Sequence, residues 1–207
     1  MPAADRALLI FAGGRATRLG GVNKGLLRVG GQTILERILD ALGPLAAERV
    51  ALGPADALSG LRGVRSVPDL EPFAGVLPAL AHGLASTTAD VCLAVAFDMP
   101  FASRAVFERL LQVQHERAAD VVIPRTAGFL EPMHAVYRRA PVEAAINAAL
   151  ARGERRMVAY FESVRVEEVD AASLTDLDPP GRAFFNVNTP EDLASARQAA
   201  GDDLPGR

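Results

Sequence analysis

Short apolar runs alternate along the chain with segments whose apolar residues recur at helical spacing. The runs at 7–11 and 90–97 are apolar almost throughout and do not alternate with polar residues. Such runs are typical of strands covered on both faces, as in a parallel sheet flanked by helices. Between residues 34 and 42 the apolar positions instead follow the period of a helix, behind a capping-box pattern at Thr33 and Glu36.

The same alternation continues to the end of the chain. Further strands are predicted at 49–52, 64–67, 121–124, 131–138, 164–169 and 184–188. Further helices are predicted at 76–85, after Ser103, from Pro141, near 155–161 and after Thr189, with Pro190 as first helical residue. Strands that alternate with helices indicate an α/β fold, a doubly wound, mostly parallel sheet with helices on both faces in a Rossmann-like arrangement. We expect a single domain over 1–207, with its core at about 7–199 and a frayed tail from about 201.

Composition narrows the class of protein. The chain has 207 residues, half of them hydrophobic and 23% charged, which excludes a disordered chain. A net charge of −3 argues against nucleic acid or an anionic membrane as the main partner. No apolar run approaches the roughly 20 residues of a membrane span, and the first residues lack a signal-peptide pattern. With Cys92 as its single cysteine, the chain is expected in the reducing cytoplasm.

A glycine-rich, basic loop follows the first strand. It contains two glycine pairs and three cations: Gly13, Gly14, Arg15, Arg18, Gly20, Gly21 and Lys24. Glycines allow backbone N–H groups to approach a ligand closely, and the cations suit a phosphate chain. The loop matches neither the P-loop nor the dinucleotide fingerprint. We therefore predict a nucleoside triphosphate site that includes Phe11 and Ala12; the alternative is a solvated surface loop.

Two aspartates stand where ligands bind such sheets, beyond the carboxyl ends of strands. Asp98 ends the apolar run at 90–97, and a carboxylate there with a triphosphate suffices to bind magnesium. Its alternative role is to cap the next helix, for which Ser103 is better placed. Asp69 follows the strand at 64–67 and could accept hydrogen bonds from the N1–H and 2-amino groups of guanine. An ordinary turn aspartate is the alternative.

Longer segments carry a resemblance to a known family. They read Phe11-Ala12-Gly13-Gly14, Arg18-Leu19-Gly20-Gly21, Asn23-Lys24-Gly25, Glu131-Pro132-Met133-His134-Ala135-Val136-Tyr137 and Asn186-Val187-Asn188-Thr189-Pro190-Glu191-Asp192. The chain resembles the molybdenum cofactor guanylyltransferases of the sugar-nucleotide-transferase-like superfamily. It departs from the family pattern at four positions. The chain has Phe11 where the family has Leu, Leu19 where it has Met, Asn23 where it has Asp, and Phe97 where it has Cys. The segment at 73–75 aligns only loosely behind Asp69.

The resemblance implies further site residues. Glu131 and His134 become residues on the pterin side of the site, and Asn186 and Asn188 would orient phosphate or complete a metal shell. The residues alone leave His134 as a histidine of a buried strand, and Asn188 as a residue that ends a strand. Lys24, Arg18 and Asp98 become the catalytic set, with Asp98 as the ligand of Mg²⁺.

The implied reaction transfers GMP from GTP to the terminal phosphate of molybdenum-carrying molybdopterin and releases pyrophosphate. The implied partners are a GTP-binding accessory protein and the molybdoenzymes that accept the cofactor. The alternative is a related enzyme that uses CTP and acts on molybdopterin or on a sugar or alcohol phosphate. Asn23 and the loose alignment after Asp69 are consistent with this alternative. A non-catalytic GTP-binding module is the alternative of a different class.

Overall fold

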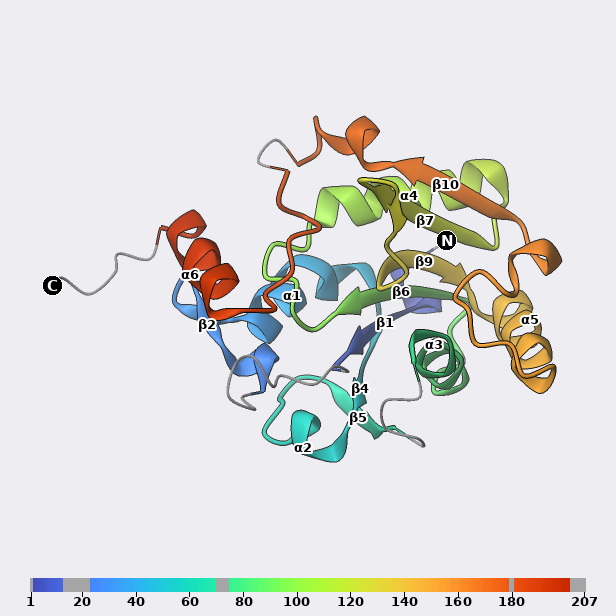
Figure 1. Ribbon diagram of the computed structural model, residues 1–207, viewed down its shortest axis with the longest axis horizontal. Coiled ribbons are helices and arrows are strands. Elements are labelled where there is room, and N and C mark those ends of the chain that lie inside the picture. Colours follow the sequence, from blue (N-terminus) through green and yellow to red (C-terminus); the bar gives the residue numbers. More distant parts are fainter. Residues whose placement is uncertain (1, 13–22, 70–74, 179–180, 202–207) are drawn as a thin grey trace, which may run out of the picture.

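The computed structural model describes residues 2–12, 23–69, 75–178 and 181–201, and in this part of the chain one large sheet runs through the molecule (Figure 1). Its strand order is β10-β7-β9-β6-β1-β4-β5, and β8 pairs with β7. These strands are β1 (Arg6–Phe11), β4 (Glu48–Gly53), β5 (Arg65–Pro68), β6 (Val91–Ala96), β7 (Val121–Thr126), β8 (Phe129–Leu130), β9 (His134–Arg138) and β10 (Val166–Asp170). A separate hairpin pairs β2 (Arg28–Val29) with β3 (Gln32–Thr33).

The sheet is mostly parallel, as predicted. β1 pairs in parallel with β4 and β6, β4 with β5, and β10 with β7. β9 runs antiparallel to both β6 and β7, and β8 antiparallel to β7. The carboxyl ends of β1, β4, β5 and β6 therefore lie at one edge, where the start of the antiparallel β9 joins them.

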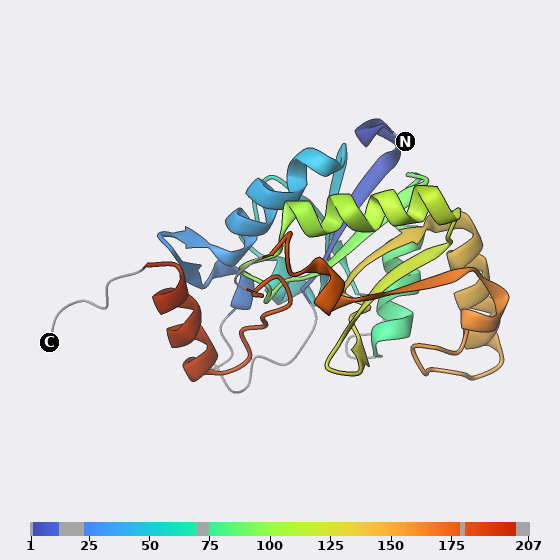
Figure 2. The ribbon, with the colours of Figure 1, turned by 90° about the horizontal axis from the view of Figure 1, so that it is seen from above.

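Helices cover both faces of the sheet. α1 (Ile34–Leu42), α4 (Arg104–Arg117) and α6 (Pro190–Ala199) belong to one side, and α3 (Val76–Ala85) and α5 (Arg139–Ala151) to the other. Alternate residues of β1 serve the two layers: Leu8 and Ile10 pack toward α1 and α4, Leu9 and Phe11 toward α3. Seen from above, α4 lies over the strands beside α1 (Figure 2). Among the described residues, no helix is long and apolar enough to cross a membrane.

Short helices complete the chain. The four-residue α2 (Ala55–Leu58) lies between β4 and β5. The 3₁₀ turns are η1 (Ala3–Asp5), η3 (Lys24–Leu26), η4 (Gly43–Leu45), η5 (Phe161–Ser163) and η6 (Ala171–Leu174).

Three predicted helix caps are confirmed, at Thr33, Ser103 and Thr189. The Thr33 hydroxyl accepts from the backbone N–H of Glu36, and the Glu36 carboxylate accepts from that of Thr33. Ser103 caps α4 through the N–H of Val106. Thr189 caps α6 with Pro190 as its first residue. These signals work because they satisfy N–H groups that a helix start leaves without partners.

Two predicted elements are wrong. The segment 184–188 is irregular rather than a strand, and its Val187 N–H donates to the Asp98 carbonyl 2.8 Å away, beyond the end of β6. The segment 155–161 forms turns that lead into η5 instead of a helix. Within it Tyr160 alone is buried, so it has one anchor rather than the apolar stripe that holds a helix on a core.

Candidate functional site

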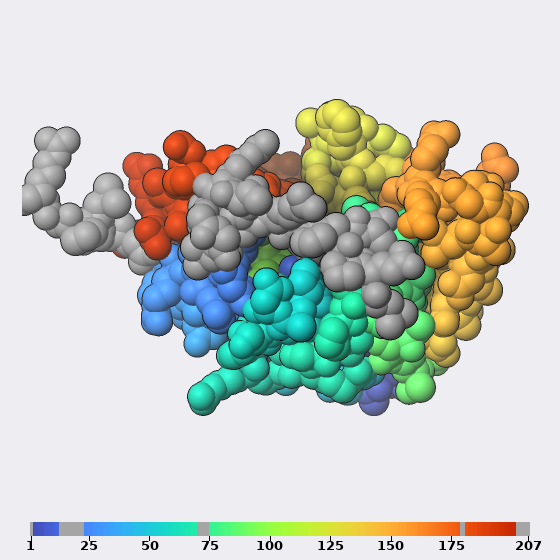
Figure 3. All heavy atoms as spheres, turned by 60° about the horizontal axis from the view of Figure 1, so that its bottom comes forward, coloured from blue at the N-terminus to red at the C-terminus, as the bar shows by residue number. Residues whose placement is uncertain are grey.

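The carboxyl ends of four strands are tied together at one edge of the sheet. The Ala12 N–H donates to the Leu52 carbonyl at 2.6 Å, and the Phe97 N–H to the Phe11 carbonyl at 3.0 Å. The Asp69 N–H donates to the Gly53 carbonyl at 2.9 Å. Figure 3 shows this side of the molecule, with residues 23–33 in blue, α2 in cyan and the loop 126–133 in yellow. The backbone thus extends the sheet by about one residue, and the polar side chains begin there.

Lys24, Asp98 and Asn188 meet at this edge, and we call them the strand-edge cluster. The Lys24 Nζ donates to Asp98 Oδ2 at 2.9 Å and to Asn188 Oδ1 at 2.7 Å, across 74 and 164 residues of sequence. The side chains of Lys24 and Asp98 are only 12% and 17% exposed. An ion pair this shielded from water is stronger than a surface pair. The cluster therefore places a shielded ion pair and an amide at the end of the sheet where α/β folds bind ligands.

The backbone around Lys24 explains how a lysine reaches Asp98. Lys24 opens η3, and a Cβ added at Gly25 would stand 2.1 Å from the ring of Phe97. The glycine therefore lets the lysine segment lie directly on the residue that precedes Asp98. On the other side of Lys24, the Asn23 Nδ2 donates to the Ala57 carbonyl of α2 at 2.6 Å. A carboxylate could not make that bond, so the departure from the family's aspartate has a local structural reason.

Asn188 reaches the cluster because two hydrogen bonds hold the backbone of the segment before α6, one to the end of β6 and one to α6. The bond from the Val187 N–H to the Asp98 carbonyl holds it on the end of β6, and the Asn188 N–H donates to Asp192 Oδ2 at 2.9 Å. The sequence indicated Asn188 but gave Asp192 no role in the site. The signal was present, since Thr189 and Asp192 have capping-box spacing.

The cluster offers the donor atoms that a divalent cation takes. The oxygens of Asp98 and Asn188 both lie within 3 Å of one ammonium ion, so they already stabilise positive charge. Magnesium binds through one or two carboxylates together with substrate phosphates, a smaller protein set than zinc or calcium requires. In the described part of the chain, no three His, Cys, Asp or Glu residues gather into a metal-binding group. The cluster fits a cation that arrives with a phosphate substrate.

Asp69 lies at the same edge, beyond β5. Burial raises the pKa of its carboxyl above the ordinary value, and the neighbouring His82 imidazole partly opposes that shift. The His82 Nε2 lies 3.0 Å from the Pro68 carbonyl, which ties α3 to the end of β5. Asp69 is therefore a partly buried carboxyl on the rim of the edge rather than a fully solvated turn residue.

Comparisons with known proteins show the family to which the chain belongs. Residues 8–169 match the model of the MobA-like NTP transferase domain. A "Probable molybdenum cofactor guanylyltransferase" of Pelotomaculum thermopropionicum is 35% identical, over 96% of this chain and 95% of that protein. The chain belongs to the MobA-like NTP transferase family. A molybdenum cofactor guanylyltransferase of Desulfosudis oleivorans is 32% identical over 92% of this chain and 94% of its own.

Solved structures show the same fold. Molybdopterin-guanine dinucleotide biosynthesis protein A of Archaeoglobus fulgidus has a TM-score of 0.77 and 24% identity, over 95% of this chain and 100% of that one. The 2-C-methyl-D-erythritol 4-phosphate cytidylyltransferase of Thermus thermophilus has a TM-score of 0.69 and 22% identity, over 97% and 100%. Because GTP- and CTP-directed names both occur on this fold, the fold alone does not select the base.

In this family member His134 lies in the core. It is 0% exposed, and its ring stacks on Phe107 at 4.5 Å and lies against Phe184 at 4.6 Å. Its Nδ1 is 3.4 Å from the Met99 sulfur. Burial lowers the pKa of His134 to about 3, so the ring is neutral near pH 7. His134, Met99, Phe107 and Phe184 form what we call the histidine cluster. The role of His134 on the pterin side of the site stays a prediction.

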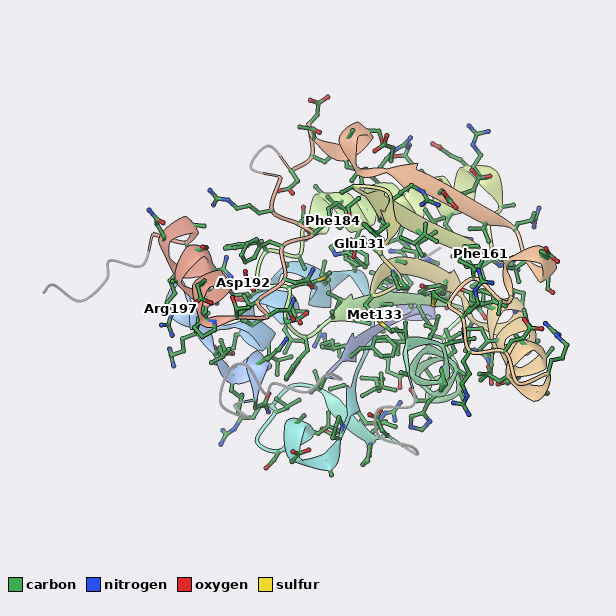
Figure 4. The ribbon with its side chains drawn as sticks, in the orientation of Figure 1. Glu131, Met133, Phe161, Phe184, Asp192 and Arg197 are labelled. Atoms are coloured by element: carbon green, nitrogen blue, oxygen red, sulfur yellow. The ribbon has the colours of Figure 1, made fainter. Side chains whose placement is uncertain are left out.

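The side chains of Glu131 and Asn186 form hydrogen bonds with residues outside the strand-edge cluster. The Thr126 hydroxyl donates to Glu131, and Figure 4 shows Glu131 in the turn before β9. The Asn186 Nδ2 donates to the Phe184 carbonyl at 3.0 Å, a bond within its own segment. The pterin-side position of Glu131, and the phosphate or metal role of Asn186, stay predictions.

The predicted nucleotide loop is only partly visible. Phe11 is buried, and a Cβ on Gly83 of α3 would meet its ring at 2.9 Å, so its side chain serves the core. Ala12 approaches Gly53 so closely that a Cβ there would lie 2.9 Å from the Ala12 Cβ. Both residues remain at the edge through their backbone. The predicted loop residues Gly13, Gly14, Arg15 and Arg18 lie outside the described residues.

A groove of about 620 Å³ opens on the helical layer beside the site, lined by parts of α1, α6 and the loop after β6. The Arg37 Nε donates to the Pro100 carbonyl at 2.7 Å, and Arg182 donates to the Ala199 carbonyl at 2.9 Å. Both guanidinium groups lie over the ring of Phe101, at 5.3 and 5.8 Å. These bonds hold the loop after Asp98 against α1 and α6, so we assign the groove's charged groups a structural role.

Proposed function

We propose that this protein is a molybdenum cofactor guanylyltransferase that transfers GMP from GTP to the terminal phosphate of molybdenum-carrying molybdopterin. Its membership of the family and the names of its full-length relatives support this reaction. The observation that carries the proposal is the strand-edge cluster, where Lys24, Asp98 and Asn188 converge from distant parts of the sequence. A non-catalytic module that only binds GTP need not keep a metal-binding carboxylate such as Asp98.

The proposed chemistry needs positioning and charge stabilisation rather than a base. An oxygen of the pterin phosphate attacks the α-phosphorus of GTP, and the bond from that phosphorus to the bridging oxygen of the β-phosphate breaks. Pyrophosphate leaves with the electron pair. Because the attacking phosphate is already an anion, no proton has to be removed from it. Rate enhancement then comes from in-line alignment and from cations near the charge that develops.

Each cluster residue has a proposed task in that step. A bound Mg²⁺ would neutralise phosphate charge, with Asp98 and Asn188 as the protein oxygens that hold it. Lys24 binds the phosphates of the leaving group as a compact point charge. Arg18, with the backbone of 11–14, is proposed to bind the same phosphates, on sequence grounds alone.

Asp69 is the proposed reader of the base. Guanine presents two neighbouring donors, N1–H and the 2-amino group, to which a carboxylate can bind with both oxygens, whereas cytosine lacks that pair. The partly buried position of Asp69 supports the role, since a carboxylate shielded from water gains more from two hydrogen bonds.

The test is a calorimetric titration of GTP and of CTP, each with Mg²⁺, into the wild type, Asp69→Asn and Asp56→Asn. Asp56 is a matched control because it is an exposed aspartate on the neighbouring α2. We expect preference for GTP, lost only in Asp69→Asn, with at least a roughly 10-fold fall in affinity for two lost charge-assisted bonds.

Preference for CTP would overturn the guanylyl assignment and indicate a cytidylyltransferase. Tight binding of GTP without release of pyrophosphate on addition of the molybdopterin acceptor would indicate a non-catalytic binding module. An unchanged GTP preference in Asp69→Asn would leave the reaction intact but remove Asp69 as its base reader.

A further inference from the structure

Asp192 sits between the start of α6 and the strand-edge cluster. Its Oδ2 accepts from the backbone N–H groups of both Asn188 and Thr189, each at 2.9 Å. Its own N–H donates to the Thr189 hydroxyl at 3.1 Å, which completes the capping box. Figure 4 shows Asp192 at the start of α6, on the side that faces the core of the molecule. The bond to Asn188 is additional to an ordinary capping box.

That additional bond closes a ring of contacts. Asp98 accepts from Val187 through its carbonyl and from Lys24 through its side chain, and Lys24 also donates to Asn188. Asn188 is exposed, so packing does not fix its side chain. What fixes its backbone is the Val187 bond on one side and the Asp192 carboxylate on the other.

We infer that Asp192 is a positioning residue of the transferase site, because it holds Asn188 so that its amide oxygen keeps Lys24 in place beside Asp98. The inference rests on the proposed function for its consequence in turnover, but the geometry it concerns exists without nucleotide. The electrostatics agree, since the N–H of Asn188 is the largest of the influences that lower the pKa of Asp192, and Lys24 adds to them. Asp192 thus stays ionised at neutral pH.

The other capping box supplies a natural comparison. Glu36 accepts from the Thr33 N–H at 2.7 Å and caps α1 in the same manner, but within the described part of the chain no hydrogen bond links it to a site residue. If capping were the whole role of Asp192, loss of the Asp192 carboxylate and loss of the Glu36 carboxylate would affect the Lys24 ammonium group equally. A positioning role predicts different effects at Lys24.

Lys24 is the sole lysine of the sequence, which makes it a clean reporter. Protein labelled with lysine carrying ¹⁵N at Nζ gives one side-chain ammonium signal in an NMR spectrum, and hydrogen bonds slow the exchange of those protons with water. The experiment compares the wild type with Asp192→Asn, Glu36→Gln, and Thr189→Val, which removes the cap hydroxyl but keeps Asp192. Asn188→Ala provides the signal expected when Lys24 loses its amide acceptor.

We expect Asp192→Asn to move the Lys24 signal toward that of Asn188→Ala, while Glu36→Gln and Thr189→Val leave it at the wild-type position. GTP affinity should fall roughly 10-fold in Asp192→Asn alone, as for outer residues that orient a ligand-binding group. Asp192→Glu keeps the carboxylate and should restore part of the Lys24 signal and part of the GTP affinity. If Asp192→Asn does not fold, Asp192→Glu provides the comparison with the wild type instead.

A wild-type Lys24 signal in folded Asp192→Asn overturns the inference, as does an equal change in Thr189→Val. If the wild type binds no GTP, the proposed function fails, yet the ammonium signal of the nucleotide-free protein still decides the role of Asp192.

Discussion

The strand-edge cluster and the histidine cluster draw on the same two segments of chain, and they have opposite character. Asp98 and Met99 are neighbours in sequence, but Asp98 bonds Lys24 at the rim, whereas Met99 contacts His134 in the core. In the segment before α6, Asn188 joins the first cluster and Phe184 the second. The strand-edge cluster presents polar atoms at the carboxyl end of the sheet. The histidine cluster packs in the core against the two segments that carry those polar atoms.

The difference teaches that a residue of a family motif can lie in the core, where it packs against the segments that carry the polar cluster. Lys24 is partly exposed and charged, and His134 is enclosed and neutral. Substitutions in the strand-edge cluster should therefore cost activity and little stability. Substitutions in the histidine cluster should cost stability first.

Asp98→Ala is expected to have the largest effect. Loss of the carboxylate removes the oxygen that holds Lys24 and the proposed metal ligand, so turnover should fall roughly 10³-fold or more. The fold should survive, since the side chain lies at the rim rather than in the core. Pyrophosphate release with GTP and molybdopterin, alongside circular dichroism, measures both. Turnover within a few-fold of wild type would exclude Asp98 from the chemistry.

Lys24→Arg should come next, at about a 10²-fold loss of turnover. The planar guanidinium is longer than the lysine ammonium and cannot occupy the point between Asp98 and Asn188, which both lie within 3 Å of Nζ. The chain contains many arginines, and Arg28→Lys on the exposed part of β2 is the control for this exchange. Equal losses in both variants would contradict a specific need for lysine at 24.

His134→Leu should have the smallest effect on turnover and a distinct effect on stability. With a pKa near 3 in the folded protein and about 6.5 unfolded, His134 binds more protons when unfolded at intermediate pH. The contribution of His134 to the free energy of unfolding is therefore highest above pH 6.5 and falls as pH decreases toward 3, by up to about 1.4 kcal/mol per pH unit. Between pH 6.5 and 5 this amounts to about 1–2 kcal/mol.

Denaturation by urea at several pH values checks that slope. His134→Leu should lower stability at pH 7 but flatten the decline between pH 6.5 and 5. His115→Gln, an exposed histidine of α4, should keep the decline of the wild type. A slope unchanged in His134→Leu would show that another group takes up the proton.

The amino-acid sequence by itself determined the elements whose signals are local. Runs of apolar residues predicted the buried strands. Thr33, Ser103 and Thr189 predicted helix starts, because caps satisfy backbone groups within a few residues. It also indicated Lys24, Asp98 and Asn188 as site residues, through their positions after strands and the family resemblance.

Only the tertiary structure decided which residues meet. The contact of Lys24 with Asn188 spans 164 residues, and no periodicity encodes such a pairing. The enclosure of His134 depends on rings from α4 and from the segment before α6, so a strand motif could not separate a core histidine from one that faces a ligand. The second task of Asp192 likewise exists only because the folded chain brings Asn188 to the end of β6, where a capping carboxylate can act on the site.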